Sequence, residues 1–287
     1  MSRLTALVPG ALCAAALGRQ WPGDLDGQIR CIDEGTRSLG LAYCCAPWSP
    51  ESEDASLRTE LGGHADPGAG SPASPAGDLA PGAHRSLESF PAHESRSRAG
   101  NDDAVAAGLA RMPGAPPVLG LISGPVTWGI RAGYGPALED AVDAASDLAS
   151  ARIRALAECG VERVVVVESA AAGCVPHTDL VAEAHSPLLR TAEHLRIGLV
   201  LVACDLDGVE SSGYDRWVSD RGCSNGAGIL SRAAFNSRPE LEQSLDRLRA
   251  VAEPGPEEVI TAPLDGSVSP GLVRHAARGL AQAAARP

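Results

Sequence analysis

Short apolar runs recur along the chain, and several of them lack the polar alternation of a half-exposed strand. The clearest reads VERVVVVES, and another reads IGLVLVAC. Runs of this kind are typical of parallel sheets that are buried on both faces. We predict strands at Leu39–Cys45, Pro117–Ser123, Val161–Ser169, Ile197–Cys204, Gly226–Ser231 and Glu257–Pro263.

Helical patterns separate these runs. Segments 135–160, 177–196, 238–253 and 269–285 repeat their apolar residues at a spacing near 3.6, which predicts amphipathic helices. Weaker strands at Leu4–Pro9 and Tyr214–Asp220 bring the total to about eight β–α units, the number in a closed (β/α)8 TIM barrel. We therefore predict one α/β barrel domain over residues 1–287. An open doubly wound sheet is the alternative, and no GxGxxG turn supports it.

The segment 47–102 interrupts the β–α alternation. It is rich in Pro, Gly, Ser and Ala, and a loop of this length is usually functional or disordered. It follows the second predicted strand and so leaves the C-terminal rim of the barrel. We predict an insertion that is either flexible or forms a lid.

Composition narrows the chemistry. Hydrophobic residues make up 44% and charged residues 21% of the chain, as in soluble globular proteins, but aromatic residues make up only 3%. The core must therefore be built from Ala, Val, Leu and Ile. All 24 basic residues are arginine, and the lack of lysine excludes Schiff-base chemistry. The Arg and Ala bias is typical of a GC-rich bacterium.

Charge and cysteine usage point to a cytoplasmic protein. The net charge of −12 argues against nucleic-acid binding, which depends on neutralising phosphates. No apolar stretch approaches the ~18 residues of a membrane span, and the apolar segment near the start has no clear cleavage site. The eight cysteines form no CxxC motif, so we expect reduced thiols.

Four stretches carry a family resemblance: LGLISGPVTWGI, VVVVESAA, SPLLRTA and PLDGSVSP. A strand that ends in Gly-Pro-x-Thr, followed by a strand that ends in an acid, resembles the uroporphyrinogen decarboxylase and cobalamin-independent methionine synthase superfamily. The resemblance extends from about Pro117 to the C-terminus. It implies a TIM barrel with lyase or methyltransferase activity.

Both chemistries of that superfamily lack key residues in this chain. In the methyl-transferring branch, a His-x-Cys triplet and a later Cys hold zinc; here the triplet reads Val202-Ala203-Cys204, and Asp265 lies near the second Cys position. We therefore predict no metal and no cofactor, with a rearranged zinc site as the alternative. The decarboxylase branch uses an N-terminal arginine motif and an Asp at the second strand, and neither is present. Uroporphyrinogen is thus not the expected substrate.

Four candidate catalytic residues lie at or just past predicted strand ends, where barrel active sites form. Glu168 ends a run of four valines, Cys204 ends the next strand, and Asp265 follows the last strand. His177 follows a strong strand and could act as a general acid or base. The competing interpretations are an acid tied to backbone amides, a buried thiol, and a turn-forming Asp.

Five further residues are candidates for substrate binding. Thr127 and Trp128 follow the Gly-Pro pair, and Asp205 follows a strand-ending thiol. Arg131 and Arg232 lie just past strand ends, where a guanidinium suits a carboxylate or phosphate. Surface arginines and a helix cap are the competing interpretations.

The sequence thus predicts an enzyme that acts on a small carboxylate-bearing metabolite by decarboxylase-type lyase chemistry or one-carbon transfer. A zinc-dependent thiol methyltransferase and a non-catalytic ligand-binding barrel are the alternatives. We expect a small-molecule substrate and neither nucleic acid nor membrane as a partner, and a homodimer is left open.

Overall fold

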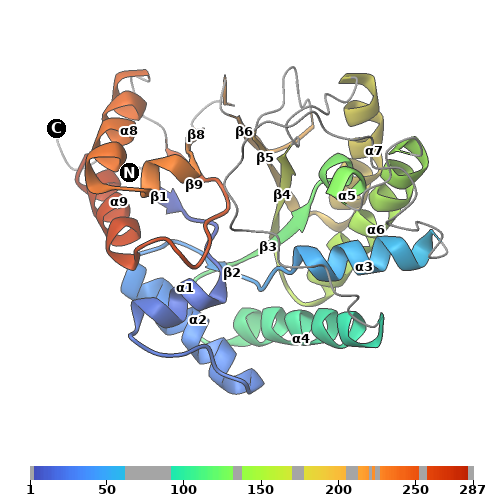
Figure 1. Cartoon of the computed structure of the whole chain (residues 1–287), viewed down its shortest axis with the longest axis horizontal. Coiled ribbons are helices and arrows are strands. Elements are labelled where there is room, and N and C mark those ends of the chain that lie inside the picture. The colour runs from blue at the N-terminus through green and yellow to red at the C-terminus, as the bar shows by residue number, and fades with distance from the viewer. Residues whose placement is uncertain are drawn as a thin grey trace, which may run out of the picture.

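Strands at the centre of the molecule form two sheets (Figure 1). A computed structural model describes residues 3–61, 92–131, 138–169, 178–204, 213–219, 222–223, 227–251 and 257–283. The larger sheet has the order β2 (Cys44–Cys45), β3 (Val118–Ser123), β4 (Arg163–Ser169), β5 (Gly198–Cys204), β6 (Arg216–Ser219) and β7 (Gly222–Cys223). The smaller sheet has the order β1 (Arg3–Thr5), β9 (Glu258–Thr261) and β8 (Ala227–Leu230).

Pairing in both sheets is parallel except between β6 and β7. Residues that are paired on neighbouring strands point to the same face of the sheet. Val167 of β4 is paired with Val202 of β5, which is paired in turn with Val218 of β6. At the C-terminal end, Ser169 pairs with Cys204. All of these parallel strands therefore end at the same edge, where ligand sites of such sheets form.

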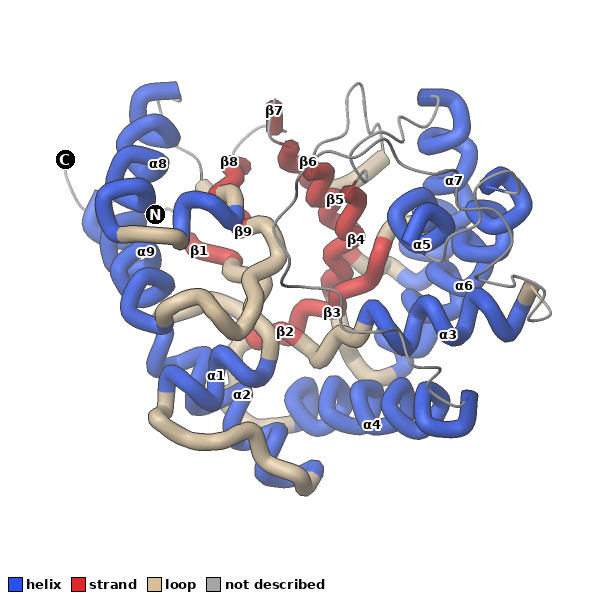
Figure 2. The backbone as a smooth tube through the Cα atoms, in the orientation of Figure 1, coloured by secondary structure: helices blue, strands red, loops and turns tan. Residues whose placement is uncertain are grey.

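Helices lie to the left of, below and to the right of the strands in the view of Figure 2. Helices α6 and α7 lie on the side of the larger sheet, and α8 and α9 lie beside the smaller one (Figure 1). The helices are α1 (Gly10–Ala16), α2 (Leu25–Leu39), α3 (Pro50–Glu60), α4 (Ala92–Arg111), α5 (Pro125–Arg131), α6 (Leu138–Glu158), α7 (Thr178–Leu195), α8 (Arg238–Val251) and α9 (Pro270–Ala283), with a 3-10 helix η2 (Arg232–Phe235).

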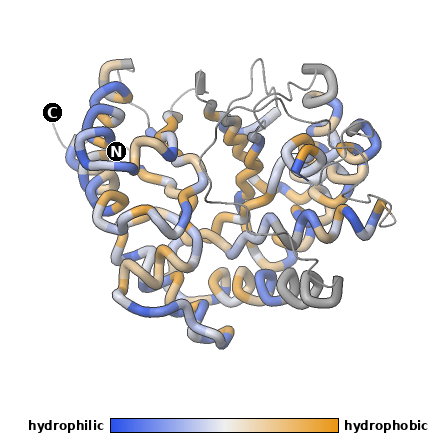
Figure 3. Tube along the Cα trace, viewed as in Figure 1, coloured by the Kyte–Doolittle hydropathy of each residue, from blue (hydrophilic) through white to orange (hydrophobic). Residues whose placement is uncertain are grey.

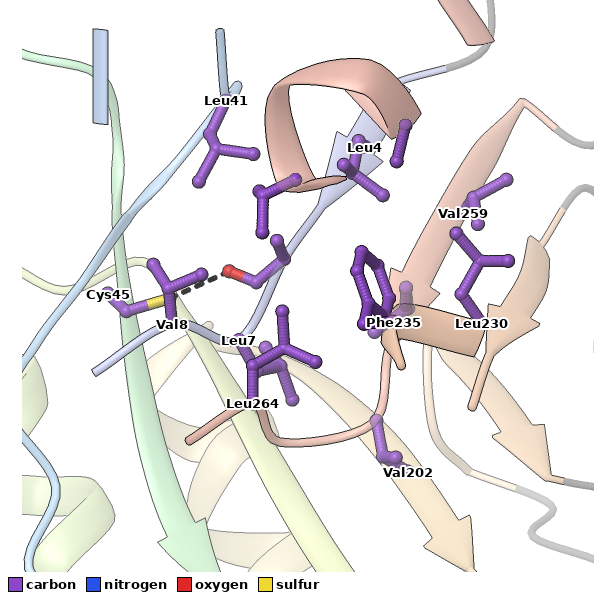
Figure 4. Close-up of a cluster of buried hydrophobic side chains, with 14 of the residues drawn as sticks. Leu4, Leu7, Val8, Leu41, Cys45, Val202, Leu230, Phe235, Val259 and Leu264 are labelled. Atoms are coloured by element: carbon purple, nitrogen blue, oxygen red, sulfur yellow. Dashed lines mark hydrogen bonds between the residues drawn. The ribbon is translucent and has the colours of Figure 1, made fainter. Parts of the chain in front are cut away.

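The two sheets share one buried core. Val165 and Val167 of β4 belong to the same cluster as Val259 and Leu230 of the smaller sheet. Figure 4 shows part of this cluster, with Val202 of β5 among the labelled side chains. In Figure 3 the hydrophobic colour follows the central strands, whereas α8 and α9 carry hydrophilic stretches. The larger sheet is therefore apolar on its inner face, which meets the smaller sheet.

The opposite face of the larger sheet packs against helices. Val164 and Val166 of β4 lie in a second cluster with Ile153 of α6 and Leu188 of α7. Because side chains alternate along a strand, even-numbered residues of β4 face the helices and odd-numbered residues face the shared core. This burial on both faces explains why the strand sequence shows no polar alternation.

The predicted α/β class with parallel strands is confirmed. The predicted barrel requires a closed ring of eight hydrogen-bonded strands. Among the described strands, no hydrogen bonds join one sheet to the other, so the strand pairing does not show a closed ring. Strands β6 and β8 nevertheless lie in contact. The two sheets therefore meet side by side without a shared ladder in the described part of the chain.

The segment 47–102, predicted as one long insertion, contains all of helix α3 and the start of helix α4. Helix α3 begins at Pro50, and α4 begins at Ala92. Pro at the first position and acids in the first turn favour a helix start in PESED, but the Pro- and Gly-rich centre of the segment hid this signal. Residues 62–91 lie outside the described part of the chain. No described helix is both long and apolar enough to cross a bilayer.

Candidate functional site

The structure arranges the described candidate residues into three separate polar groups. Each group lies at or just beyond the C-terminal end of a strand. One centres on Glu168, one on Arg131 and one on Arg232. His177 and Asp205 lie outside the described residues, so their proposed roles stay predictions.

Glu168 is fully buried and surrounded by donors. The backbone N–H of Val126 donates to its Oε1 at 3.2 Å, and that of Thr127 donates to its Oε2 at 2.8 Å. The Thr127 hydroxyl forms a further short hydrogen bond to Oε2. The same hydroxyl accepts a hydrogen bond of 2.6 Å from the Ser169 N–H. The carboxylate therefore ties the start of α5 to the end of β4.

Gly124 makes this contact sterically feasible. A Cβ atom built at Gly124 would lie 2.0 Å from Cδ and 2.1 Å from Oε1 of Glu168, which is far inside van der Waals contact. Pro125 then starts α5, at the position where its missing N–H is harmless. The Gly-Pro-x-Thr motif thus has a local explanation: it gives room to a buried acid and supplies donors to it.

His185 and Tyr214 extend the Glu168 group. Nε2 of the buried His185 lies 2.8 Å from Glu168 Oε1, and the Tyr214 hydroxyl lies 2.9 Å from His185 Nδ1. Burial, and then the charge of Glu168, raise the pKa of Tyr214 well above its usual range. The Tyr214 hydroxyl therefore keeps its proton at neutral pH.

The Glu168 side chain lies on the face of β4 that packs against the helices, not on the face that lines the shared core. Glu168 follows the even-numbered alternation of β4, and its partners lie on α5 and α7. The contacts are those of an acid tied to backbone amides, the competing interpretation at the sequence level. Its catalytic role stays a prediction.

Sequence reasoning missed His185 as a polar partner. It lies in the middle of α7, between two helical turns, and not near the end of a strand. Only the rotation of α7 against β4 brings it to Glu168. The sequence holds no local signal for this contact.

Arg131 is held by two acids of α3. Its Nε donates to Asp54 Oδ1 at 2.7 Å, its NH2 group donates to Glu53 Oε2 at 3.1 Å, and its NH1 group donates to the Ser123 hydroxyl at 2.8 Å. Burial raises the pKa of Glu53 even though Ser123 and Arg131 oppose that shift. Arg131 thus fastens α3 to the end of β3, and its charge is already compensated.

Arg232 and Asp265 form the most exposed group. Arg232 Nε and NH2 donate to Asp265 Oδ2 at 3.0 and 2.9 Å, and NH1 donates to Asn236 Oδ1 at 3.1 Å. The Ser267 hydroxyl and N–H, followed by Arg232, lower the pKa of Asp265. Asp265 is therefore ionised at neutral pH and orients a guanidinium at the ends of β8 and β9. The sequence predicted both residues but not their pairing.

The two remaining described candidates, Cys204 and Trp128, belong to none of these three polar groups. Cys204 ends β5 beside Ser169, and its side chain lies outside what the structure describes. Trp128 is buried, with 2% of its surface exposed, in the helical layer that covers the larger sheet.

The residues at the zinc positions of the resembled methyltransferases do not fit zinc. Val202 is fully buried in the shared core, and an alkyl side chain carries no donor atom. Asp265 is engaged by Arg232 and Ser267. Zinc sites require three or four N, S or O donors. Within the described residues, no three His, Cys, Asp or Glu side chains come together as a metal site.

Comparison with known proteins shows a likeness to a solved structure over nearly the full length of the chain. No protein-family model and no curated protein matches the sequence. The chain is similar to the solved structure of a methyltransferase from Methanosarcina mazei, with a TM-score of 0.63 and 14% sequence identity. The superposition covers 98% of this chain and 94% of that chain. The two proteins therefore share a fold over almost their whole lengths.

Proposed function

We propose that the protein is an enzyme that transfers a methyl group to or from a small, carboxylate-bearing metabolite. The full-length likeness to a methyltransferase carries this proposal. The resemblance around Gly-Pro-Val-Thr supports the same superfamily. In this proposal the two sheets are arcs of one (β/α)8 barrel, as their shared core and the contact between β6 and β8 suggest.

The proposed substrate site lies at the C-terminal ends of the strands. Leu264, which precedes Asp265, and Phe235, which lies in η2 with Arg232, belong to one buried cluster with Val202 of β5. Figure 4 labels all three of these core residues. The polar groups that follow them are therefore expected to face a common mouth, as in other barrels.

Arg232 is the proposed carboxylate-binding residue. Its guanidinium is fixed by Asp265, which stays ionised, and its side chain keeps 37% exposure to solvent. Asp265 holds the Nε and NH2 side of this guanidinium, so a substrate carboxylate would bind the NH1 and NH2 side by displacing the Asn236 and Ser267 acceptors. Glu168 would act through α5 as a positioning residue, because donors already surround its carboxylate.

In methyl transfer, a bond from the acceptor atom to the methyl carbon forms as the bond to the donor breaks, and a protonated acceptor loses its proton. A fixed arrangement of donor and acceptor lowers the barrier to such a displacement. Arg232 would hold one reactant through its carboxylate. Cys204, at the end of β5, remains the candidate thiol.

A thermal-shift screen with carboxylates, thiols and folates tests the substrate class. We expect a carboxylate to raise the melting temperature of the wild-type protein, and Arg232→Gln to lose that shift. Arg238→Gln is the matched control, because Arg238 is an exposed arginine paired with Glu242 on α8. A shift that persists in Arg232→Gln, or that never appears, would rule out this carboxylate site.

The type of reaction needs its own readout. A ligand from the screen is offered with a 13C-methyl-labelled folate and a thiol, and the label is followed by NMR. Movement of the label to a new atom supports methyl transfer. Release of CO2 from the ligand without such movement would instead identify the decarboxylase-type lyase.

We propose in addition that the reaction proceeds without zinc at β5. The buried Val202 and the Arg232-bound Asp265 support this. Metal analysis of protein purified without a histidine tag is expected to find far less than an equimolar amount of zinc. Near-equimolar zinc that disappears in Cys204→Ser would overturn this proposal and favour a thiol methyltransferase.

A further inference from the structure

A further polar group lies at the opposite end of the strands from the Arg232 group. A cavity of about 360 Å³ is found there, where the N-terminal ends of strands from both sheets meet. Strands β1, β4, β6 and β9 each contribute their first residue, and one lining residue directly precedes β2. The cavity is lined by Arg3, Tyr43, Arg163, Arg216, Glu257 and Glu258. This lining carries three guanidinium groups and two carboxylates, which leaves a formal charge of +1.

The two acids of the cavity compensate only part of its positive charge. Glu258 is 5% exposed, and both of its oxygens are occupied: Oε1 accepts from the Thr5 hydroxyl and Oε2 from Arg216 NH1, each at 2.5 Å. Arg163 NH1 donates to the same carboxylate at 3.3 Å. Glu257 is 78% exposed, and its carboxylate lies 3.7 Å from Arg216 NH2, so water screens its charge. A single buried carboxylate therefore neutralises the interior of the cavity incompletely.

The arginines keep donors that a ligand can reach. In their hydrogen bonds to the described residues, Arg163 and Arg216 use only NH1, and 27% and 26% of their side chains are exposed. Their Nε and NH2 atoms are not among the buried unpaired atoms of the described residues, so these nitrogens are accessible. Arg3 is exposed, and its side chain has no hydrogen bond or ion pair with any described residue. The Tyr43 hydroxyl accepts from Arg163 NH1 at 3.1 Å, which leaves its own hydrogen to donate.

We propose that this cavity binds a phosphate group, as free phosphate or as a small phosphate monoester. Guanidinium groups from three strands can contact oxygens on several sides of a tetrahedral anion, whereas a planar carboxylate is held by a single guanidinium fork. The Tyr43 hydroxyl adds a neutral donor. The site lies at the other end of the strands from the proposed substrate site, so it is independent of the proposed methyl transfer.

Calorimetric titration of the full chain tests this proposal with inorganic phosphate and phenyl phosphate as the probes. We expect saturable binding at one site per chain for at least one probe, weakened by added NaCl because salt screens the attraction. Acetate, a planar anion with one charge, should bind more weakly than the phosphates. Binding of inorganic phosphate alone would identify the free anion as the ligand, and tighter binding of phenyl phosphate would identify an ester. No binding of either probe would overturn the proposal.

Substitutions of single arginines locate the site. Arg3→Gln removes an exposed guanidinium without breaking a contact to the described residues, so it should fold and weaken phosphate binding by about threefold to tenfold. Arg238→Gln is the matched control, because Arg238 is an exposed arginine paired with Glu242 on α8, and it should keep the wild-type affinity. Arg232→Gln, at the other end of the strands, should keep it as well. Loss of binding in Arg232→Gln with full affinity in Arg3→Gln would overturn the proposal.

Glu258→Gln should act in the opposite direction. It removes the negative charge that competes with an anion and leaves the arginines in place, so phosphate should bind more tightly than to wild type by about threefold or more. Phosphate should also raise the urea midpoint of this variant more than that of wild type, because the bound anion replaces the missing counter-charge. Unchanged or weaker binding to folded Glu258→Gln would contradict the site. Equal affinity of Arg3→Gln and wild type would contradict it even if Glu258→Gln failed to fold.

Discussion

The buried carboxylate of Glu168 is expected to be the most sensitive single group of the fold. Replacement by Gln keeps the size but places an amide NH2 group against the Val126 and Thr127 N–H groups and the Thr127 hydroxyl. We expect Glu168→Gln to lower the free energy of unfolding by about 2–4 kcal/mol, measured by urea denaturation. Glu162→Gln, at an exposed position just before β4, is the control. Equal stability of both variants would show that the donors around Glu168 contribute little.

The thiols of the core are expected to be unreactive. Burial is the main cause that raises the pKa of Cys13 and of Cys45 to about 12 and that of Cys44 to about 11. The Cys45 thiol also donates to the Ala6 carbonyl at 3.3 Å. At about pH 8 the thiolate fraction of these groups is on the order of one in a thousand or less, and only the thiolate is nucleophilic.

Iodoacetamide labelling followed by peptide mapping measures this directly. Cys13, Cys44 and Cys45 should stay unlabelled in the native protein and react fully after unfolding. Their reactivity should rise only as the pH approaches the raised pKa values. Rapid native labelling of Cys45 near pH 8 would contradict its placement in the core.

At the residue scale, the sequence predicted positions better than contacts. The positions of the predicted strand ends were enough to single out Glu168, Arg232 and Asp265. Their partners depend on how one element rotates against another, which a hydrophobic pattern does not encode. The contact of His185 with Glu168 and the pairing of Arg232 with Asp265 are of this kind.

At the scale of elements, the turn from β3 to α5 depends on Gly124. An added methyl group would collide with the Glu168 carboxylate and push it away from the Val126 and Thr127 N–H groups. We expect Gly124→Ala to destabilise the protein by about 2–4 kcal/mol, measured as a shift of the urea midpoint. Gly23→Ala, where a Cβ meets nothing within 4 Å, should change stability by less than about 0.5 kcal/mol. A tolerated Gly124→Ala would mean that Glu168 can move at little cost.

The sequence predicted the long buried strands well and the short or polar elements poorly. The start of β5 was misplaced by one residue, because a strand buried on both faces is a continuous apolar run. Helix α2 was missed although its boundary signals are present: Asp24 accepts from the Gly27 N–H at 2.7 Å, and Gly40 ends the helix with φ of 73°. Its many polar residues hide the apolar face.

At the scale of the whole molecule, the α/β class was predictable, but the way the two sheets meet was not. Counting β–α units assumes that every apolar run becomes a full strand. Strand β1 has three residues and β2 has two, which is too short to form long ladders. Packing in the shared core and ion pairs therefore hold the sheets together where no ladder does.

Glu258 is the clearest of these links. It is 5% exposed on β9 and accepts hydrogen bonds from Thr5 of the same sheet at 2.5 Å. From the other sheet, Arg216 NH1 donates to it at 2.5 Å and Arg163 NH1 at 3.3 Å. The Glu258 carboxylate thus lies between the partly buried guanidinium groups of Arg163 and Arg216. Without this carboxylate the two positive charges would repel each other.

We expect Glu258→Gln to lower the free energy of unfolding by about 1–3 kcal/mol, because both arginines lose their shared counter-charge while keeping some contact with water. The adjacent Glu257 provides the control: its side chain is 78% exposed and lies 3.7 Å from Arg216 NH2. Glu257→Gln should change stability by less than about 0.5 kcal/mol, as for other surface pairs. Urea denaturation at low and high salt distinguishes them, since screening should weaken the exposed pair more than the buried one. Equal effects of the two substitutions would show that packing alone joins the two sheets.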